Sequence, residues 1–469
     1  MLLHKRASVA TIPPAKTTGQ LEAVISSDLL SQHLQNLRSL WDAGLDAADY
    51  DAAWVCAGEA MMHFRDDHGP HYKPSAYLSQ WVDPAYITPG SRLWHAPGSR
   101  PTLFLLAEED YWHAPAALPN YLDDLVSIRT FADTQTLQSA IQQHEQSFRG
   151  AVATIGPPES TPGDNHSQPD LNPSVLLNYL DYHRAVKSGY ELALMRAASD
   201  IGARGHLAAA AAFLDGGSEF DIHMAYLVAS AQNESELPYG NIVALNEHGA
   251  TLHYQHQVRR PPSQHRSLLI DAGGQYQGYA SDITRTYAAQ GSTHELFHEL
   301  LNAMQAHQDQ LIESISPGQT FADLHVQMHQ QLAELLVRQD IVQCDAANAV
   351  DLGITRAFCP HGLGHLLGVQ VHDAGGHMAD AQGTPAPPPS IDATLRFTRT
   401  MEQDQVFTIE PGLYFIPSLL ASLKQDKAPI NWSKVDALTP YGGIRIEDNV
   451  RVLSSGVENL TRQAFDALI

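Results

Sequence analysis

Two aspartates flank a turn-forming segment in the middle of the 469-residue sequence. Asp271 and Asp282 are separated by Gly273-Gly-Gln-Tyr-Gln-Gly278, whose glycines favour a tight turn. A hairpin folded at Tyr276 and Gln277 would bring the two carboxylates opposite one another on adjacent strands. Carboxylates held so close repel each other unless a cation lies between them, so the pattern indicates a divalent metal site. The alternative is a pair of surface aspartates near a turn, because turns are rich in Asp.

Two glutamates further along the chain could join such a site. Glu410 ends an apolar segment and directly precedes a Pro-Gly turn, a position from which its carboxylate can point into a cleft. Glu447 lies in Gly442-Gly-Ile-Arg-Ile-Glu-Asp-Asn-Val450, where strand alternation places Arg445 and Glu447 on one face and the isoleucines on the other. Either glutamate alone could equally be a charge on an exposed strand edge.

Histidines gather in a glycine-rich segment. His361, His365 and His372 lie in the segment 360–373, whose interspersed glycines disfavour a helix, so a loop that presents imidazoles to the site is expected. The chain has 25 histidines, and most histidines are surface or core residues rather than ligands. His325 and His329, on a predicted amphipathic helix, are therefore assigned to packing.

Short strands and amphipathic helices are expected to position these residues. Helices are predicted over 182–213, 220–231 and 324–339, the last two after the capping sequences Ser218-Glu-Phe-Asp221 and Thr320-Phe-Ala-Asp323. Strands are predicted over 267–271, 280–287, 368–371, 406–414 and 443–450. Every candidate ligand lies on or beside one of these strands.

The segment 155–173 is rich in turn formers and is the predicted domain boundary. Before it, a helix over 20–43 and buried strands over 53–56 and 101–106 indicate an α/β domain spanning 1–172. The remainder, 173–469, is predicted to be the catalytic domain.

Composition excludes several classes of partner. Acidic residues outnumber basic ones 52 to 28, and the formal charge of −24 repels nucleic acid. No apolar run approaches the roughly 18 residues of a membrane span.

The expected location is cytoplasmic. The start of the chain shows no export signal. The three cysteines, Cys56, Cys344 and Cys359, are widely spaced, so reduced thiols are expected.

The candidate residues match the ligand pattern of the pita-bread metallopeptidases, and the chain resembles the bacterial Xaa-Pro dipeptidase (prolidase) branch of that family. The resemblance covers nearly all of Tyr190–Val450, and weaker similarity occurs at His63–His68 and Asp110–His113. The segments that carry it are Tyr190-Glu-Leu-Ala, Pro238-Tyr-Gly-Asn-Ile-Val-Ala-Leu-Asn-Glu-His248, Leu269-Ile-Asp-Ala-Gly, Gly278-Tyr-Ala-Ser-Asp-Ile-Thr-Arg-Thr286, Pro360-His-Gly-Leu-Gly-His365, Thr408-Ile-Glu-Pro-Gly and Gly442-Gly-Ile-Arg-Ile-Glu-Asp-Asn. It implies an α+β pita-bread (creatinase/aminopeptidase-like) catalytic domain behind an α/β N-terminal domain that dimerises and forms the rim of the active site.

The resemblance also implies a ligand set. Asp282 and Glu447 would bridge two divalent cations, Asp271 would complete one cation, and His365 with Glu410 would complete the other. Four carboxylates and one imidazole favour hard cations. Mn²⁺ is the metal that the resemblance suggests, with Co²⁺ as a substitute.

The implied reaction is hydrolysis of dipeptides with a C-terminal proline by a hydroxide that bridges the two metals. Glu410 would carry a proton to the leaving amine, while His361 and His372 line the site and His372 contacts the scissile carbonyl.

The proline carboxylate would be bound by His253 and Arg396, with Arg445 nearby. Each of these three has a simpler alternative. His253 could be a packed strand residue, Arg396 a loop residue, and Arg445 a counter-charge to the acid cluster. The sequence departs from its relatives at Tyr254–Arg260, beside His253, and in an N-terminal extension of about twenty residues.

Other activities fit the same residues. An aminopeptidase P-like exopeptidase would remove the first residue from longer peptides, and the same hydroxide could attack organophosphate triesters. A metal-free peptide-binding module of this fold is disfavoured because all five ligand positions hold the expected residue type. The resemblance further implies a homodimer in which Asp66 or Asp67 would meet the substrate amine in the partner's pocket. A surface turn is the alternative for this pair.

Overall fold

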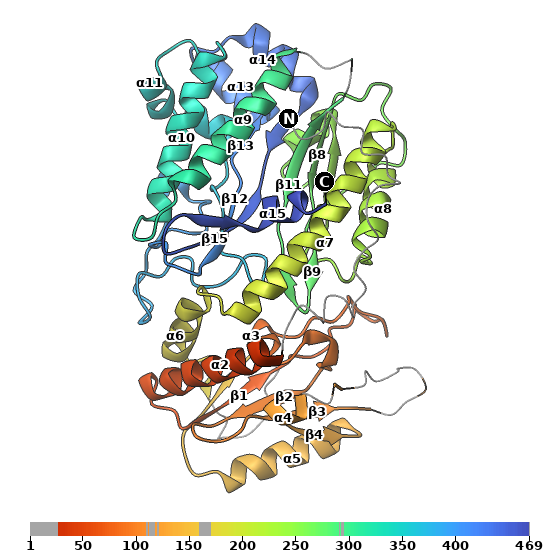
Figure 1. The fold of residues 1–469 in the computed structure, drawn as a ribbon, viewed down its shortest axis with the longest axis vertical. Helices are drawn as coiled ribbons and strands as arrows, with labels where there is room; N and C mark the ends of the chain where they lie inside the picture. The colour runs from red at the N-terminus through yellow and green to blue at the C-terminus, as the bar shows by residue number, and fades with distance from the viewer. Residues whose placement is uncertain are drawn as a thin grey trace.

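The computed structural model describes residues 27–108, 111, 118–119, 122–158, 170–289, 291 and 295–468. A smaller N-terminal domain lies at the bottom of Figure 1, and a larger domain lies above it. The N-terminal extension, most of the predicted boundary segment and most of the segment 110–113 fall outside the described residues.

The N-terminal domain is built on a six-stranded mixed sheet with the strand order β4-β3-β2-β1-β5-β6. β1 is antiparallel to β2 and parallel to β5, and β3 is parallel to β4. Its strands are β1 (Ala52–Cys56), β2 (Arg92–His95), β3 (Thr102–Leu106), β4 (Ser127–Phe131), β5 (Val152–Ile155) and β6 (Asp170–Leu171). The predicted strands 53–56 and 101–106 are confirmed as β1 and β3.

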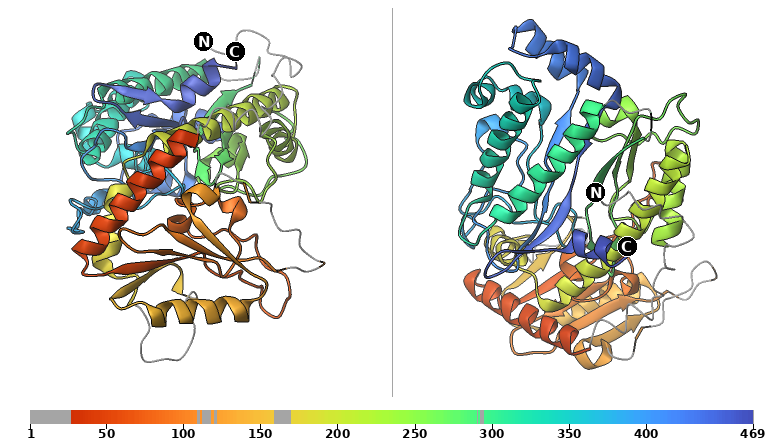
Figure 2. Two further views of the ribbon diagram at one scale, coloured as in Figure 1. Left: turned by 60° about the horizontal axis from the view of Figure 1, so that its bottom comes forward. Right: turned by 45° about the horizontal axis from the view of Figure 1, so that its top comes forward.

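Helices cover both faces of this sheet (Figure 2). Alternation along β1 sends Ala53 and Val55 to the face covered by α2 (Ser27–Ala47) and α6 (Ser174–Arg184), and sends Trp54 to the face covered by α5 (Thr134–Ser147). α6 packs into the N-terminal core although it lies beyond the domain boundary predicted between 172 and 173. The position of that boundary stays a prediction.

The larger domain packs pairs of long helices against antiparallel strands. α7 (Gly189–Leu214) and α8 (Glu219–Ser230) cover the sheet β11-β8-β7. α9 (Glu295–Ser314) and α10 (Phe321–Arg338) lie on the other side of the strands in Figure 1, where they pack with β12 and β15 into the largest hydrophobic core. The remaining strand bounds are β7 (Ile242–Leu245), β8 (Ser267–Asp271), β11 (Thr284–Ala288), β12 (Val406–Ile409), β13 (Gly412–Tyr414), β14 (Gly443–Arg445), β15 (Asp448–Val452) and β16 (Val457–Asn459).

The helix start predicted at Ser218 is confirmed. The Ser218 hydroxyl accepts the backbone N–H of Asp221, and the Asp221 carboxylate accepts the backbone N–H of Ser218, a reciprocal capping box. At α10, Thr320 caps in the same way, but the Asp323 carboxylate bonds to the Thr320 hydroxyl. The second box is therefore only half formed.

The predicted hairpin exists, with a register that differs from the expected one. Strands β9 (Gln275–Tyr276) and β10 (Tyr279–Ala280) are joined by Gln277 and Gly278, which have φ angles of 47° and 84°. On the neighbouring ladder, however, Asp271 pairs with Thr284, two residues beyond Asp282. The two aspartates are therefore near one another without being cross-strand partners.

Three other strand predictions need correction. Residues 368–371 form a series of bends rather than a strand, because the N–H of Gly368 bonds back to the carbonyl of Gln370. The predicted strands 406–414 and 443–450 are each interrupted, at Glu410 and at Glu447. Both interruptions fall at candidate ligands. Among the described helices, none is long and apolar enough to cross a lipid bilayer.

Candidate metal centre

The two aspartates lie where β8 ends and just before β11 begins. The Tyr239 hydroxyl is 2.8 Å from Asp271 Oδ1 and 2.5 Å from Asp282 Oδ1, so one phenol spans both carboxylates. Burial raises the pKa of Asp271, although Arg445 opposes it. Burial acts the same way on Asp282, but a contact with His365 outweighs it and leaves the pKa of Asp282 lowered.

Glu447 joins the two halves of the catalytic domain at this point. Its backbone N–H donates to the carbonyl of Thr284 at 3.0 Å, and the Thr284 hydroxyl donates to Glu447 Oε2 at 2.6 Å. The residue is only 2% exposed. Glu447 is therefore not a charge on an exposed strand edge, which was the alternative.

His365 and Glu410 approach from the opposite wall. His365 Nε2 lies 3.4 Å from Asp282 Oδ2 and 3.8 Å from Glu410 Oε1. Its Nδ1 lies 3.0 Å from the carbonyl of Leu366, a contact that orients the ring with Nε2 toward the carboxylates. The loop around it requires glycine, because a Cβ at Gly364 would lie 2.0 Å from the carbonyl oxygen of Thr408.

The charge balance of this cluster fits divalent cations. Asp282, His365 and Glu447 each present a ligand atom within 4.8 Å of the others. Burial and neighbouring carboxylates raise the pKa of Glu447 well above its ordinary value, and burial raises the pKa of Glu410 to about 7. Four carboxylates face one neighbouring guanidinium, that of Arg445, so the excess negative charge is what bound cations would compensate.

Arg445 is held by protein groups. Its Nη2 donates to Asp271 Oδ2 at 2.6 Å, its Nη1 to the Tyr414 hydroxyl at 3.0 Å, and its Nε to the Thr284 hydroxyl at 3.1 Å. It is 4% exposed. These contacts fit the alternative in which Arg445 is a counter-charge to the acidic cluster. They also fix the orientation of Asp271.

Two more predicted histidines border the carboxylates. His361 Nδ1 lies 3.7 Å from Glu410 Oε2, and its Nε2 lies 2.9 Å from the Tyr414 hydroxyl. The ring of His372 packs edge-on against that of His365 at 4.5 Å. Burial lowers the pKa of His361 to about 3 and that of His372 to about 4, so both imidazoles are neutral at neutral pH.

A cavity of about 1220 Å³ opens onto this centre between the two domains. It is lined by Asp271, Asp282, Tyr239, His372 and the exposed His253 of the catalytic domain. The N-terminal domain supplies residues 71–74 and 83–86 to the same lining. The cavity therefore connects the metal-compatible residues to a wall built by both domains.

Arg396 and the pair Asp66 and Asp67 lie away from the lining. The Arg396 side chain is exposed, yet its charge contributes to the lowered pKa of His372. Asp66 and Asp67 are also exposed, and Asp66 accepts the N–H of His68 at 3.2 Å within its own turn.

Three groups in the site were not singled out from the sequence. Tyr239 and Thr284 lie inside segments that carried the family resemblance, but a lone Tyr or Thr there has no chemical signature of its own. Lys73 was not anticipated either. Its Nζ donates to the carbonyl of Leu237 at 2.9 Å and links the two domains at the cavity wall.

Comparisons with known proteins identify the family of the chain. Residues 193–454 match the profile described as metallopeptidase family M24, and residues 28–182 match the Xaa-Pro dipeptidase N-terminal domain. The Xaa-Pro dipeptidase of Aeromonas hydrophila subsp. hydrophila is 42% identical over 443 residues, which cover 93% of this chain and 99% of that relative. The Xaa-Pro dipeptidase of Pseudoalteromonas atlantica is 43% identical over 445 residues, with 93% and 98% covered.

Solved structures with this architecture include aminopeptidase P from E. coli with the inhibitor Pro-Leu. It aligns with a TM-score of 0.70 at 22% identity over 94% of this chain and 96% of that one. Proline aminopeptidase P II from Yersinia pestis aligns with a TM-score of 0.66 at 22% identity over 92% and 96%. At this identity the likeness establishes the fold, and the predicted α/β domain plus pita-bread catalytic domain is confirmed. The chain therefore belongs to metallopeptidase family M24, in the branch of the Xaa-Pro dipeptidases.

Proposed function

We propose that the chain hydrolyses Xaa-Pro dipeptides at a centre in which Asp271, Asp282, His365, Glu410 and Glu447 hold two divalent cations. The observation that carries the proposal is the buried group of Asp282, His365 and Glu447, with Asp271 and Glu410 beside it, at a cavity that reaches both domains. When bound, two such cations lower the pKa of a water molecule and stabilise the oxyanion of the transition state. Four carboxylates and one imidazole favour Mn²⁺.

Within this proposal, Glu410 moves the proton. The Xaa-Pro bond has no N–H, so its leaving group is a secondary amine that must gain a proton on departure. Glu410 is assigned this role because its carboxylate lies beside the cluster, 3.8 Å from His365 Nε2. His361, 3.7 Å from Glu410 Oε2, would hold that carboxyl in position.

Substrate recognition is assigned to cationic and imidazole groups around the cavity. His253 lies on the cavity wall, where it can donate to the carboxylate of a C-terminal proline. His372, on the same wall, would contact the scissile carbonyl, and Arg396 would add positive charge from the exposed rim. Arg445 would contribute through Asp271, because its donors are engaged by protein acceptors.

A direct test compares Ala-Pro with Ala-Pro-Ala as substrates of the Mn²⁺-loaded protein. Preferential cleavage of Ala-Pro is expected. Preference for the tripeptide would instead establish an aminopeptidase P-like exopeptidase. Failure to cleave either substrate with Mn²⁺ or Co²⁺, together with no bound dication, would favour the metal-free binding module.

Organophosphate triester hydrolysis is proposed only as a side activity of the same centre, because a metal-activated hydroxide can also attack phosphorus. It should require the same ligands as peptide hydrolysis. Triester turnover that survives Asp282→Asn would contradict the assignment. The homodimer and the cytoplasmic location stay predictions.

A further inference from the structure

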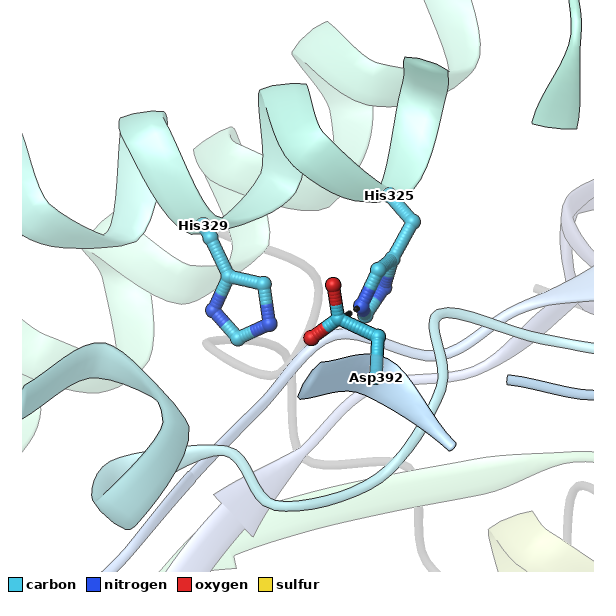
Figure 3. A group of neighbouring side chains, drawn as sticks. All are labelled: His325, His329 and Asp392. Carbon is cyan, nitrogen blue, oxygen red and sulfur yellow. Dashed lines mark ion pairs between the residues drawn. The ribbon is translucent and has the colours of Figure 1, made fainter. Parts of the chain in front are cut away.

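A second cluster of metal-ligating side chains lies outside the carboxylate centre (Figure 3). His325 and His329 occupy successive turns of α10 and face Asp392, the last residue of the short helix η5 (Ser390–Asp392). The three residues are 2%, 2% and 6% exposed. The helical pattern alone favoured a packing role for both histidines. In the structure, however, the two imidazoles, four residues apart on the helix, turn toward one carboxylate, as ligands of a metal ion do.

Three of the four imidazole nitrogens form no ordinary hydrogen bond, although His325 Nε2 lies 3.4 Å from Asp392 Oδ1. His325 Nδ1 and Nε2 and His329 Nδ1 are buried and make no hydrogen bond in the described part of the chain. Buried polar atoms are nearly always paired, because an unpaired one loses the hydrogen bonds it made with water. Packing alone therefore leaves these nitrogens unexplained, whereas a ligand in the cluster would use them.

The distances suit one small cation. Ligand atoms of the three residues lie within 4.8 Å of one another, and the two rings are 4.7 Å apart at 83°. His325 Nε2 is 3.4 Å from Asp392 Oδ1, longer than an ordinary hydrogen bond. Two ligands on a tetrahedral Zn²⁺ are separated by about 3.3 Å when each bond is about 2.0 Å.

The protonation states also suit a metal. Burial lowers the pKa of His325 and lowers that of His329 to about 3, so both imidazoles are neutral, as ligation requires. Burial would raise the pKa of Asp392, but the paired Arg356 lowers it below its ordinary value. The cluster thus presents two neutral nitrogens and one carboxylate at neutral pH.

Arg356 supports the carboxylate from outside. Its Nε donates to Asp392 Oδ1 at 2.7 Å and its Nη2 donates to Oδ2 at 3.0 Å. Each carboxylate oxygen keeps a second lone pair, and a hydrogen bond from behind is the usual way in which a ligating carboxylate is oriented. The guanidinium charge weakens attraction for hard cations, so a metal that gains from imidazole nitrogen is favoured over Mn²⁺.

We propose that His325, His329 and Asp392 form a mononuclear Zn²⁺ site, separate from the carboxylate centre, with water as the remaining ligand. The bound ion would tie α10 to the segment 390–396. That segment contacts the loop 360–373, which carries His361 and His365. The Thr394 hydroxyl donates to the carbonyl of Pro360 at 3.2 Å, and a Cβ at Gly362 would lie 2.8 Å from Leu395 Cα. The ion would therefore stiffen the wall beside His361 without touching substrate.

The test counts Zn²⁺ in full-length protein whose carboxylate centre is disabled by Asp282→Asn with Glu447→Gln. Equilibrium dialysis against Zn²⁺ followed by elemental analysis should give one bound Zn²⁺ per chain. Adding His329→Gln to that background should weaken binding by at least about 100-fold, since loss of even an outer-shell partner costs about 10- to 100-fold. His307→Gln is the matched control, because His307 is another buried histidine with an unpaired Nε2, on α9; this control should still bind.

A folded double variant that binds no Zn²⁺, or binding that survives His329→Gln, would overturn the proposal. Circular dichroism checks the fold of each variant. If the double variant does not fold, the single variant His325→Gln replaces it. The number of bound Zn²⁺ ions per chain is then compared between this variant and the wild type at saturating Zn²⁺. The variant should hold one equivalent less, and an equal count would overturn the proposal. Peptidase activity is not the readout, so the result is independent of the proposed function.

Discussion

Two buried clusters of ligand-type side chains in one domain have opposite electrostatic character. In the carboxylate centre, Glu410 and Glu447 are buried beside other carboxylates, and their pKa values are raised. In the second cluster, formed by His325, His329 and Asp392, both histidines are neutral. The one carboxylate, that of Asp392, is already neutralised by Arg356. In the metal-free protein, the carboxylates of the first cluster must hold protons or repel one another, whereas the second cluster is already balanced.

The difference teaches what each cluster requires. An excess of buried carboxylates is costly in the metal-free protein, so the first centre should bind hard dications strongly and depend on them. The second can stay empty at little electrostatic cost and should select a metal by nitrogen ligation. Substitutions and pH changes should therefore affect the two clusters differently.

The largest expected effect comes from the bridging position. Asp282→Asn should lower Mn²⁺-dependent Ala-Pro hydrolysis by at least about 1000-fold, because it removes the negative charge that supports metal activation of water. The counterpart in the other cluster, His329→Gln, should stay within about threefold of wild type, since it touches neither metal nor substrate of the first centre. Steady-state kinetics at saturating Mn²⁺ measures the rate of Ala-Pro hydrolysis by both variants. Comparable losses of activity in the two variants would contradict the distinction between the clusters.

The pH dependence of stability should separate the clusters in metal-free protein. Glu410 has a pKa raised from 4.5 to about 7, so its stabilising contribution is complete below pH 4.5 and is lost as the pH rises through 7. His329 has a pKa lowered from 6.5 to about 3, so its contribution is present above pH 6.5 and is lost as the pH falls toward 3. Acting alone, the Glu410 shift corresponds to about 3 kcal/mol.

Thermal unfolding of chelator-treated protein between pH 4 and 8 measures these slopes. Glu410→Gln should flatten the decline in Tm between pH 4.5 and 7, and His329→Gln should flatten the loss on the acid side. Added Mn²⁺ should remove the decline at neutral pH. A Tm that rises steadily to pH 8 without metal and is unchanged by Glu410→Gln would contradict the assigned charge excess.

Arg445→Met should reduce kcat/KM about 100-fold, a smaller effect. The substitution leaves Asp271 buried without its 2.6 Å partner, which raises the pKa of that carboxyl and weakens metal binding. Arg445→Lys keeps the charge and should recover part of the loss. Excess Mn²⁺ should also rescue the Met variant. A defect insensitive to Mn²⁺ would instead point to a direct contact between Arg445 and substrate.

The smallest expected effect is about 10-fold, for Tyr239→Phe. The hydroxyl spans Asp271 and Asp282, so its loss should loosen the orientation of both carboxylates while leaving them in place. Mn²⁺ affinity and kcat/KM, measured side by side, should fall together. Unchanged metal affinity with a lower kcat would assign Tyr239 to the reaction itself.

Much of the fold followed from local patterning. The buried strands at 53–56 and 101–106 and the capping box at Ser218 depend on neighbouring residues and were predicted from the sequence. The register of Asp271 against Thr284 was not, because it depends on how β8 pairs with β11 over the whole ladder.

The ligand positions were predicted largely through motifs, but their supporting contacts were not. The strands are interrupted where the N–H of Glu410 donates to the carbonyl of Leu363 and that of Glu447 to the carbonyl of Thr284. These are tertiary contacts that strand alternation cannot foresee. The contact of Arg445 with Asp271 and the approach of Asp392 to His325 join residues more than sixty positions apart. Helical spacing therefore placed His325 and His329 on one face without revealing what faces them.

The most direct test of the central claim is to locate manganese in crystals of the protein grown with Mn²⁺. Anomalous scattering at the manganese edge should show two peaks between Asp282 and Glu447, with Asp271 beside one and His365 with Glu410 beside the other. A single peak, or none at saturating Mn²⁺ in protein that hydrolyses Ala-Pro, would contradict the two-cation centre.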